Sequence, residues 1–236
     1  MDKKYDLLIE TYQRIFGMVD AIHFNSKNTA AVFAKYVSIP KGSKVIPITH
    51  NGITDCRKER NFDDHLLRLG FIGSEAPYKG LPMLKEVISQ LNDEGYTDRI
   101  SLEVYWGQKG LDKVMPNVHY KGKFAELMMG QIYENIDLLV VPSICYETFS
   151  FVTLEALSFG TPVLVSDKVG AKDLVKQYDA NFVYGSKIEL YKRIFQIVHD
   201  KEVLREFNKR ILTSSWTWSM DDHAENIINN LYLNNL

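Results

Sequence analysis

Short apolar runs alternate with amphipathic segments along almost the whole chain. The apolar runs have the length of strands, and several are apolar at nearly every position, as in strands buried on both faces of a sheet. The segments between them carry apolar residues at helical spacing, which predicts helices. The predicted strands cover residues 19–25, 44–49, 66–73, 101–106, 117–121, 137–142, 161–166 and 181–184. The predicted helices cover residues 5–16, 27–37, 79–92, 124–134, 149–159 and 170–177, two segments between 186 and 213, and residues 220–233.

This alternation predicts an α/β fold, in which a Rossmann-like parallel sheet has helices on both faces. Residues 55–64 are polar and charged, and we interpret them as a linker, although a long surface loop has the same composition. Residues 1–60 then form a β-α-β unit with its linker, and residues 61–236 form a second domain. Ligands bind outside the carboxyl ends of parallel strands. We therefore expect a site to be lined by the loops after Ile72, Trp106, Lys121, Pro142 and Ser166.

Composition narrows the class of protein. The 236 residues are 45% hydrophobic and 25% charged, which is typical of globular domains, and the net charge of −2 gives no indication of a nucleic-acid partner. Cys56 and Cys145 lack metal-ligand spacing and fit a reducing compartment. The sequence shows no signal peptide and no apolar run of the ~20 residues that span a bilayer. We expect a cytoplasmic protein, and peripheral contact with the inner face of the membrane stays open.

The predicted helix over residues 149–159 carries the most informative chemistry. It is apolar on almost every side, which is typical of a buried helix, yet it contains Glu155. A buried carboxylate needs partners, and a pair of ribose hydroxyls suits its two acceptor oxygens. The helix start, with the positive end of its dipole, suits a phosphate. Glu155 lies about two turns, roughly 9 Å, beyond that start. The alternative is that Glu155 pairs with a structural Arg or Lys and that Glu147 is an ordinary loop residue.

The residues around Glu147 and Glu155 favour the interpretation in which Glu155 binds a ligand. Glu147 and Glu155 resemble the E-x7-E signature of the retaining family 4 (group 1) glycosyltransferases of the GT-B superfamily. The flanking residues match in order and spacing, namely Pro142-Ser143, Phe149, Ala156, Gly160-Thr161-Pro162-Val163 and Gly170. The resemblance covers nearly the whole chain. It implies that residues 61–236 are the C-terminal nucleotide-sugar-binding domain of the GT-B fold with its returning terminal helix. Residues 1–60 are then the tail of the N-terminal acceptor domain with its linker.

The resemblance also implies roles for individual residues. Glu155 would bind the ribose, and Glu147 would lie beside the donor sugar as the candidate catalytic residue. The remaining donor-binding candidates are Gly73, Ser74 and Lys79 at the diphosphate, Thr148, Phe149, Ser150 and Phe151 at the start of the helix, and Gly122, Lys123 and Phe124 at the base. Three places depart from the family: Ser74 stands where an arginine is frequent, Ser150 stands where a glycine is common, and Ala171-Lys172-Asp173 stands where a glycine or proline followed by a glutamate is frequent.

The implied activity is transfer of a sugar from a UDP- or GDP-sugar, with retention, to a glycan or lipid-linked acceptor in polysaccharide biosynthesis. No cofactor or metal is expected, because the sequence contains no D-x-D motif and no zinc-ligand spacing. The acceptor half would come from a missing segment or from a partner chain, so activity of this chain alone stays open. A second hypothesis is a non-catalytic nucleotide-sugar-binding or partner subunit of a split glycosyltransferase, docked through residues 5–16 and the terminal helix. A sugar-nucleotide epimerase fits the fold but fits the two glutamates less well.

Overall fold

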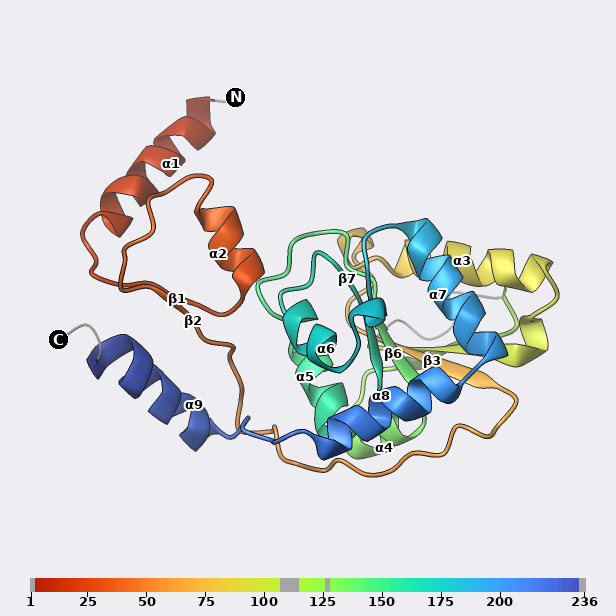
Figure 1. Cartoon of the computed structure of the whole chain (residues 1–236). Helices are drawn as coiled ribbons and strands as arrows, with labels where there is room; N and C mark the ends of the chain where they lie inside the picture. The colour runs from red at the N-terminus through yellow and green to blue at the C-terminus, as the bar shows by residue number, and fades with distance from the viewer. Residues whose placement is uncertain (1–2, 107–114, 126–127, 234–236) are drawn as a thin grey trace.

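A six-stranded parallel sheet forms the larger part of the molecule (Figure 1). The computed structural model describes residues 3–106, 115–125 and 128–233. The strand order is β5-β4-β3-β6-β7-β8. Every residue of β4 and β6 is buried, as expected for apolar strands covered on both faces. The strands are β3 (Leu67–Ile72), β4 (Ile100–Tyr105), β5 (Val118–Gly122), β6 (Leu138–Val141), β7 (Val163–Ser166) and β8 (Val183–Tyr184).

Helices cover both faces of this sheet, which confirms the predicted fold class. Right-handed crossovers place α3 on one face and α4, α5 and α6 on the other, because the chain reverses its direction across the sheet after β5. The helix α7 packs beside α3. The α-helices are α3 (Leu81–Asp93), α4 (Met129–Glu134), α5 (Phe151–Ser158), α6 (Lys172–Tyr178), α7 (Lys187–His199) and α8 (Glu202–Thr213), and the 3-10 turns are η1 (Pro77–Lys79), η2 (Thr97–Arg99) and η4 (Ala180–Phe182).

The reversal of the chain creates a switch point between β3 and β6. From β3 the chain runs outward through β4 to β5, and from β6 it runs the other way through β7 to β8. The loops that leave β3 and β6 therefore diverge and leave a crevice at the carboxyl ends of these strands. The sheet thus fixes where a ligand is expected before any side chain is considered.

Several predicted helices begin later than the pattern indicated, and three of them carry or adjoin residues expected at the site. Lys79 lies in η1, and α3 begins at Leu81 after Gly80 has turned the chain with φ +81°. Phe124 lies outside any helix, and α4 begins at Met129. The helix α5 begins at Phe151, because Ser150 has the non-helical dihedrals φ +130° and ψ +94°.

The N-terminal residues form a separate β-α-β unit, as predicted. Helix α1 (Lys3–Phe16) precedes β1 (His23–Phe24), α2 (Lys27–Phe33) and β2 (Lys44–Val45), and the two strands pair in parallel. Ser26 caps α2 by accepting a hydrogen bond from the Thr29 amide. The C-terminal helix α9 (Met220–Ile227), continued by a π-helical turn η5 (Ile228–Tyr232), returns to this unit (Figure 1). There Thr49 Oγ1 donates to the Trp218 carbonyl over 2.7 Å.

The segment interpreted as a linker lies against the larger part. Cys56 N–H donates to the Ser158 carbonyl, and the Arg57 guanidinium donates to the carbonyls of Ile211 and Ser214. Phe62 is buried in the main core. The domain boundary itself stays a prediction.

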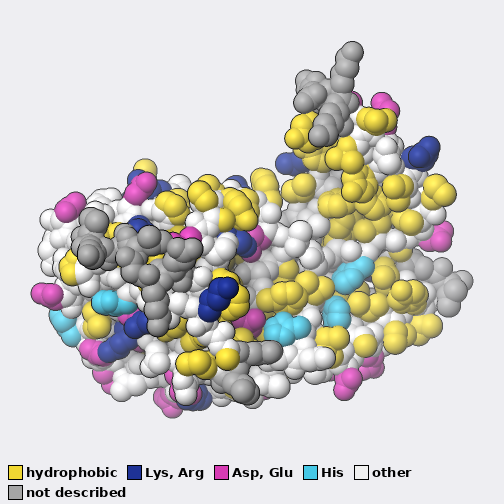
Figure 2. Space-filling model, turned by 180° about the vertical axis from the view of Figure 1, so that it is seen from behind, with side chains coloured by type: hydrophobic (Ala, Val, Ile, Leu, Met, Phe, Trp, Pro, Cys, Tyr) yellow, Lys and Arg dark blue, Asp and Glu magenta, His cyan; other side chains and the backbone are white. Residues whose placement is uncertain are grey.

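The N-terminal unit exposes many large apolar side chains. Figure 2 shows hydrophobic side chains gathered over the region of α1 and the β1–β2 pair. The exposed set on this unit is Tyr5, Leu7, Leu8, Tyr12, Ile15, Met18, Val19, Tyr36 and Val45. We call it the apolar surface of the N-terminal unit. In the described ranges no helix combines the length and the hydrophobicity that crossing a membrane requires.

Candidate functional site

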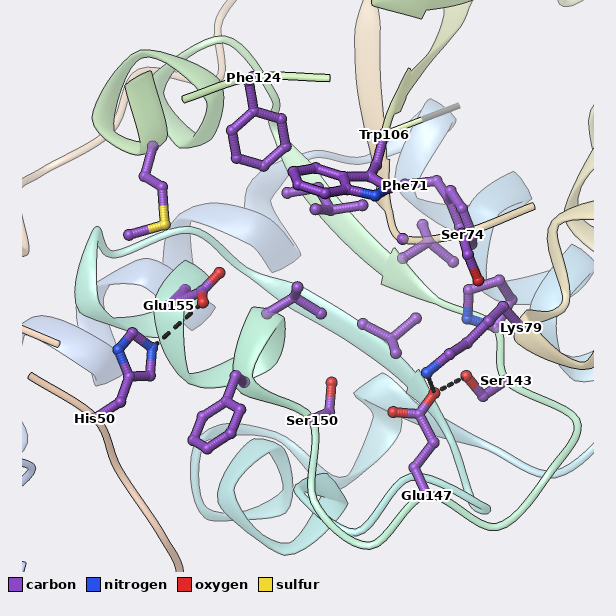
Figure 3. Close-up of a pocket in the computed structure, with 18 residues that line it drawn as sticks. His50, Phe71, Ser74, Lys79, Trp106, Phe124, Ser143, Glu147, Ser150 and Glu155 are labelled. Carbon is purple, nitrogen blue, oxygen red and sulfur yellow. Dashed lines mark hydrogen bonds and ion pairs between the residues drawn. The ribbon is translucent and has the colours of Figure 1, made fainter. Parts of the chain in front are cut away.

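A pocket of about 560 Å³ opens at the switch point between β3 and β6 (Figure 3). Its walls come from the loops after β3, β4, β5 and β6, as predicted from the carboxyl-end rule, and from α5. The loop after Ser166, which was also predicted to line the site, contributes none of the lining residues. One residue, His50, comes from the N-terminal segment. The lining residues are His50, Phe71, Ile72, Gly73, Ser74, Lys79, Trp106, Phe124, Met129, Val140, Val141, Pro142, Ser143, Glu147, Ser150, Phe151, Val152 and Glu155.

Glu155 lines this pocket from α5 and has a polar neighbour at each carboxylate oxygen. Its side chain is 15% exposed. The Tyr133 hydroxyl donates to Oε2 over 2.8 Å, and His50 Nε2 lies 3.4 Å from Oε1. Burial, together with the Glu155 carboxylate, holds the pKa of Tyr133 well above its ordinary value of 10. Tyr133 therefore keeps its proton and acts as a donor. No Arg or Lys pairs with Glu155 among the contacts of the described residues, so the structural ion pair considered from the sequence does not occur there.

Glu147 lies at the other end of the pocket and meets Lys79. Lys79 Nζ donates to Glu147 Oε1 over 2.9 Å, and the Ser143 hydroxyl donates to the same oxygen (Figure 3). The Glu147 side chain is 13% exposed and the Lys79 side chain 33% exposed. An ammonium group has three donors, so Lys79 can hold Glu147 and still offer hydrogen bonds to an anion in the pocket.

The start of α5 lies between these two glutamates. Ser150, Phe151 and Val152 line the pocket, and the side chain of the N-cap residue Ser150 makes no capping hydrogen bond to the first amides of the helix. Glu155 is four residues beyond Phe151, about 6 Å along the axis. The spacing of two turns expected from the sequence was therefore too long by about two residues. An uncapped helix start beside an ammonium group can bind a phosphate.

Aromatic rings form the wall opposite α5. Trp106 follows β4 with φ +73°, a backbone conformation that is rare for a large side chain. Its ring meets the Phe124 ring edge-on, with the centroids 5.5 Å apart, and Lys123 Nζ lies 5.8 Å from the Trp106 ring centre. Flat rings at the mouth of a pocket can stack on a nucleobase.

The structure brings most of the predicted donor-binding residues together. Those that line the pocket are Gly73, Ser74, Lys79, Phe124, Glu147, Ser150, Phe151 and Glu155. The others lie beside it: Gly122 ends β5, Phe149 is buried in the core, and the Thr148 carbonyl accepts from Thr29 Oγ1 of α2. Lys123 is connected to the site by its contact with the Trp106 ring. The ligand roles of all these residues stay predictions.

The sequence candidates did not include Trp106, Tyr133 or Ser143, and from the sequence His50, beside Asn51-Gly52, is more simply interpreted as a structural histidine than as one that faces an interdomain cleft. Trp106 and Ser143 follow strands at their carboxyl ends, so the strand assignment was a signal for them. Tyr133 and His50 reach Glu155 from distant positions in the sequence, and no spacing indicates such contacts. In the described part of the chain, no group of His, Cys, Asp or Glu side chains is arranged to hold a metal ion.

Comparison with known proteins places the chain among glycosyltransferases. A family model described as glycosyl transferases group 1 matches residues 67–200, more than half of the chain. Glycogen synthase of Bacillus cereus (strain Q1) is 28% identical over 106 residues, which cover 40% of this chain and 22% of that protein. The lipopolysaccharide 1,2-N-acetylglucosaminetransferase of Salmonella typhimurium is 24% identical over 199 residues, which cover 76% of this chain and 52% of that protein.

A solved structure extends the likeness to the fold. Anabaena Alr3699/HepE in complex with UDP-glucose matches with a TM-score of 0.73 and 17% identity, over 94% of this chain and 66% of that one. At this identity the match shows a shared fold. The matches span 22% and 52% of the lengths of the two relatives, which is less than two thirds of either protein.

Proposed function

The chain belongs to the group 1 glycosyl transferases, and on that premise we propose that it binds the nucleotide-sugar donor of a retaining glycosyltransferase. The donor is a UDP- or GDP-sugar, and the acceptor is a glycan or a lipid-linked saccharide. Relatives named for glycogen and lipopolysaccharide synthesis support this class of acceptor. The acceptor half would be supplied by further sequence or by a partner chain.

One observation carries the proposal: α5 presents an uncapped start and the Glu155 carboxylate to the same pocket, about one turn apart. The helix start and Lys79 suit a diphosphate, and the carboxylate suits the two hydroxyls of the adjoining ribose. The base would then lie toward Trp106 and Phe124, and the sugar toward Glu147.

The same parts can assist departure of the nucleotide. When the bond between the sugar and the diphosphate breaks, negative charge develops on the diphosphate oxygens. The α5 dipole and the Lys79 ammonium are already in place to stabilise that charge. Glu147, fixed by Lys79 and Ser143, would orient the hydroxyls of the donor sugar.

Calorimetric titration with UDP, GDP and the matching nucleosides tests the proposal. We expect one diphosphate to bind in the micromolar range and its nucleoside at least tenfold more weakly, because the nucleoside lacks the charge that Lys79 and α5 would hold. Folded protein that binds neither UDP nor GDP would contradict the donor-binding role.

The substitution Glu147→Gln distinguishes binding of the donor sugar from binding of the nucleotide. The change removes the charge that Lys79 neutralises, so UDP affinity should stay equal or rise. The ratio of the affinity for UDP-glucose to the affinity for UDP should fall by about fivefold, because one charged hydrogen bond to the sugar is weakened. Titration of both ligands into the wild type, Glu147→Gln and the control Glu225→Gln on exposed α9 measures this ratio. An equal loss for both ligands would show that Glu147 does not meet the sugar.

The apolar surface of the N-terminal unit favours a second candidate function, a partner subunit of a split enzyme. Contiguous exposed apolar surface marks contact sites on most soluble proteins. A partner bearing the acceptor half would cover α1 and the β1–β2 pair. Light scattering after size exclusion, combined with an assay of sugar transfer, distinguishes the two candidate functions. A monomer that transfers sugar without another chain excludes the subunit role.

A further inference from the structure

Among the described residues that line the pocket, His50 is the one that comes from the N-terminal segment. It precedes the turn at Asn51-Gly52 and enters the pocket beside Glu155 (Figure 3). Its ring meets the Phe151 ring edge-on with the centroids 5.0 Å apart, and its side chain is 31% exposed. His50 is therefore placed by packing as well as by its polar contact.

The turn also fixes which nitrogen of His50 carries the proton. The Gly52 amide donates to His50 Nδ1 over 3.1 Å. Nδ1 must then be unprotonated, so the proton of the neutral ring is on Nε2. Nε2 is the atom that faces Glu155 Oε1 at 3.4 Å. The backbone of the turn thus presents a donor to the carboxylate.

Two neighbours therefore face the two oxygens of one carboxylate. The Tyr133 hydroxyl donates to Oε2, and His50 Nε2 lies 3.4 Å from Oε1. Each carboxylate oxygen can accept more than one hydrogen bond. Tyr133 and His50 thus bracket the Glu155 carboxylate and leave its remaining lone pairs available to the pocket.

We propose that His50 is a positioning residue that sets the selectivity of this pocket for ribose over deoxyribose. The inference rests on the proposed donor-binding function, in which Glu155 accepts from both ribose hydroxyls. Two hydroxyls are bound together only if the carboxylate plane is fixed. A Glu155 released from His50 would still fill the same space, but it would bind the two hydroxyls less well.

A matched pair of substitutions isolates the Nε2 donor. Asparagine in His50→Asn can accept from Gly52 through its short side chain but does not reach Glu155. Glutamine in His50→Gln carries an amide donor near the position of Nε2. The ligands are UDP and 2′,3′-dideoxy-UDP, or the guanosine pair if the wild type prefers GDP, and the readout is the ratio of their dissociation constants. His119→Ala, an exposed histidine of β5, is the control.

In His50→Asn we expect UDP to bind about tenfold more weakly, while 2′,3′-dideoxy-UDP changes less than twofold, because only the ribose loses its positioned acceptor. His50→Gln should keep most of the wild-type ratio. Equal weakening of both ligands, or an unchanged ratio in His50→Asn, would overturn the inference while leaving the donor-binding proposal intact. A wild type that binds neither UDP nor GDP would overturn both.

Discussion

Glu155→Ala is expected to weaken UDP or GDP binding by about 100-fold or more. The substitution removes the acceptor of two ribose hydroxyls, and a hydrogen bond to a charged group contributes about 1.5–3 kcal/mol. Calorimetric titration measures the change. Glu155→Gln keeps one neutral acceptor and should lose about tenfold. Nearly wild-type affinity in folded Glu155→Ala would show that the ribose does not bind at this end of the pocket.

Stability needs its own control in this experiment. Glu155→Ala removes the nearer of the two acceptors of the buried Tyr133 hydroxyl and leaves it the Val152 carbonyl at 3.4 Å, which costs about 1 kcal/mol. The double variant Tyr133→Phe/Glu155→Ala removes both partners and should melt closer to the wild type. Its nucleotide affinity should remain as low as that of Glu155→Ala. Recovery of binding together with stability would mean that Glu155 acts only through the fold.

Gly80→Ala is expected to cost about 3 kcal/mol of unfolding free energy. Gly80 has φ +81°, which costs an alanine about 1 kcal/mol, and a Cβ there would lie 1.7 Å from the Pro142 carbonyl oxygen. The turn before α3 and the end of β6 must therefore separate. Because they carry Lys79 and Ser143, UDP affinity should fall as well. Thermal melting should show a drop of about 10 °C.

Gly95→Ala provides the matched control. Gly95 has φ +92°, and a Cβ there meets no atom within 4 Å. It should lose only about 1 kcal/mol, the cost of the left-handed backbone. Equal melting temperatures for the two variants would show that the contact between Gly80 and Pro142 is not tight in solution.

The larger sheet could be predicted almost completely, because its strands are short apolar runs buried on both faces. The β6 run from Leu138 to Val141 has no polar residue to confuse the pattern. The errors lie at helix starts. Phe149 fits the apolar helical pattern because it is buried, yet it precedes the first turn of α5. The positive φ of Ser150 is a backbone property that its residue type does not reveal, although a glycine, common there in the family, would have indicated it.

The N-terminal strands were predicted longer than they are. The runs over residues 19–25 and 44–49 are strand-like, but β1 and β2 each pair over two residues. Each of these strands has one described neighbour, so its ladder of hydrogen bonds ends where the two backbones move apart. The pattern of apolar residues indicates which positions are buried, but it does not indicate how far two backbones run side by side.

The places of the candidate site residues in the fold could be predicted from the sequence, but their side-chain contacts could not. Glu147, Glu155 and Lys79 lie in loops and a helix whose places follow from the parallel sheet. Their partners depend on tertiary packing: Tyr133 comes from the preceding helix, and His50 lies 105 positions before Glu155 in the numbering. A lone histidine beside Asn-Gly has the same sequence appearance whether it faces solvent or a ligand.

The hydrogen bonds of the connecting segments indicate where the two parts of the molecule could rotate as rigid bodies. From Cys56 onward the segment is bound to the larger part, whereas Thr49 is bound to the returning helix segment through Trp218. In the second connecting segment, which leads from α8 to α9, the Ser214 carbonyl accepts a hydrogen bond from Arg57. Residues 50–55 connect these two sets of bonds, but Ile53 packs in the main core, and Asn28 and Thr29 of α2 donate to the carbonyls of Asp167 and Thr148, so a rotation of the N-terminal unit must also break these contacts. His50 lies on this connection, and such a rotation would carry its imidazole toward or away from Glu155.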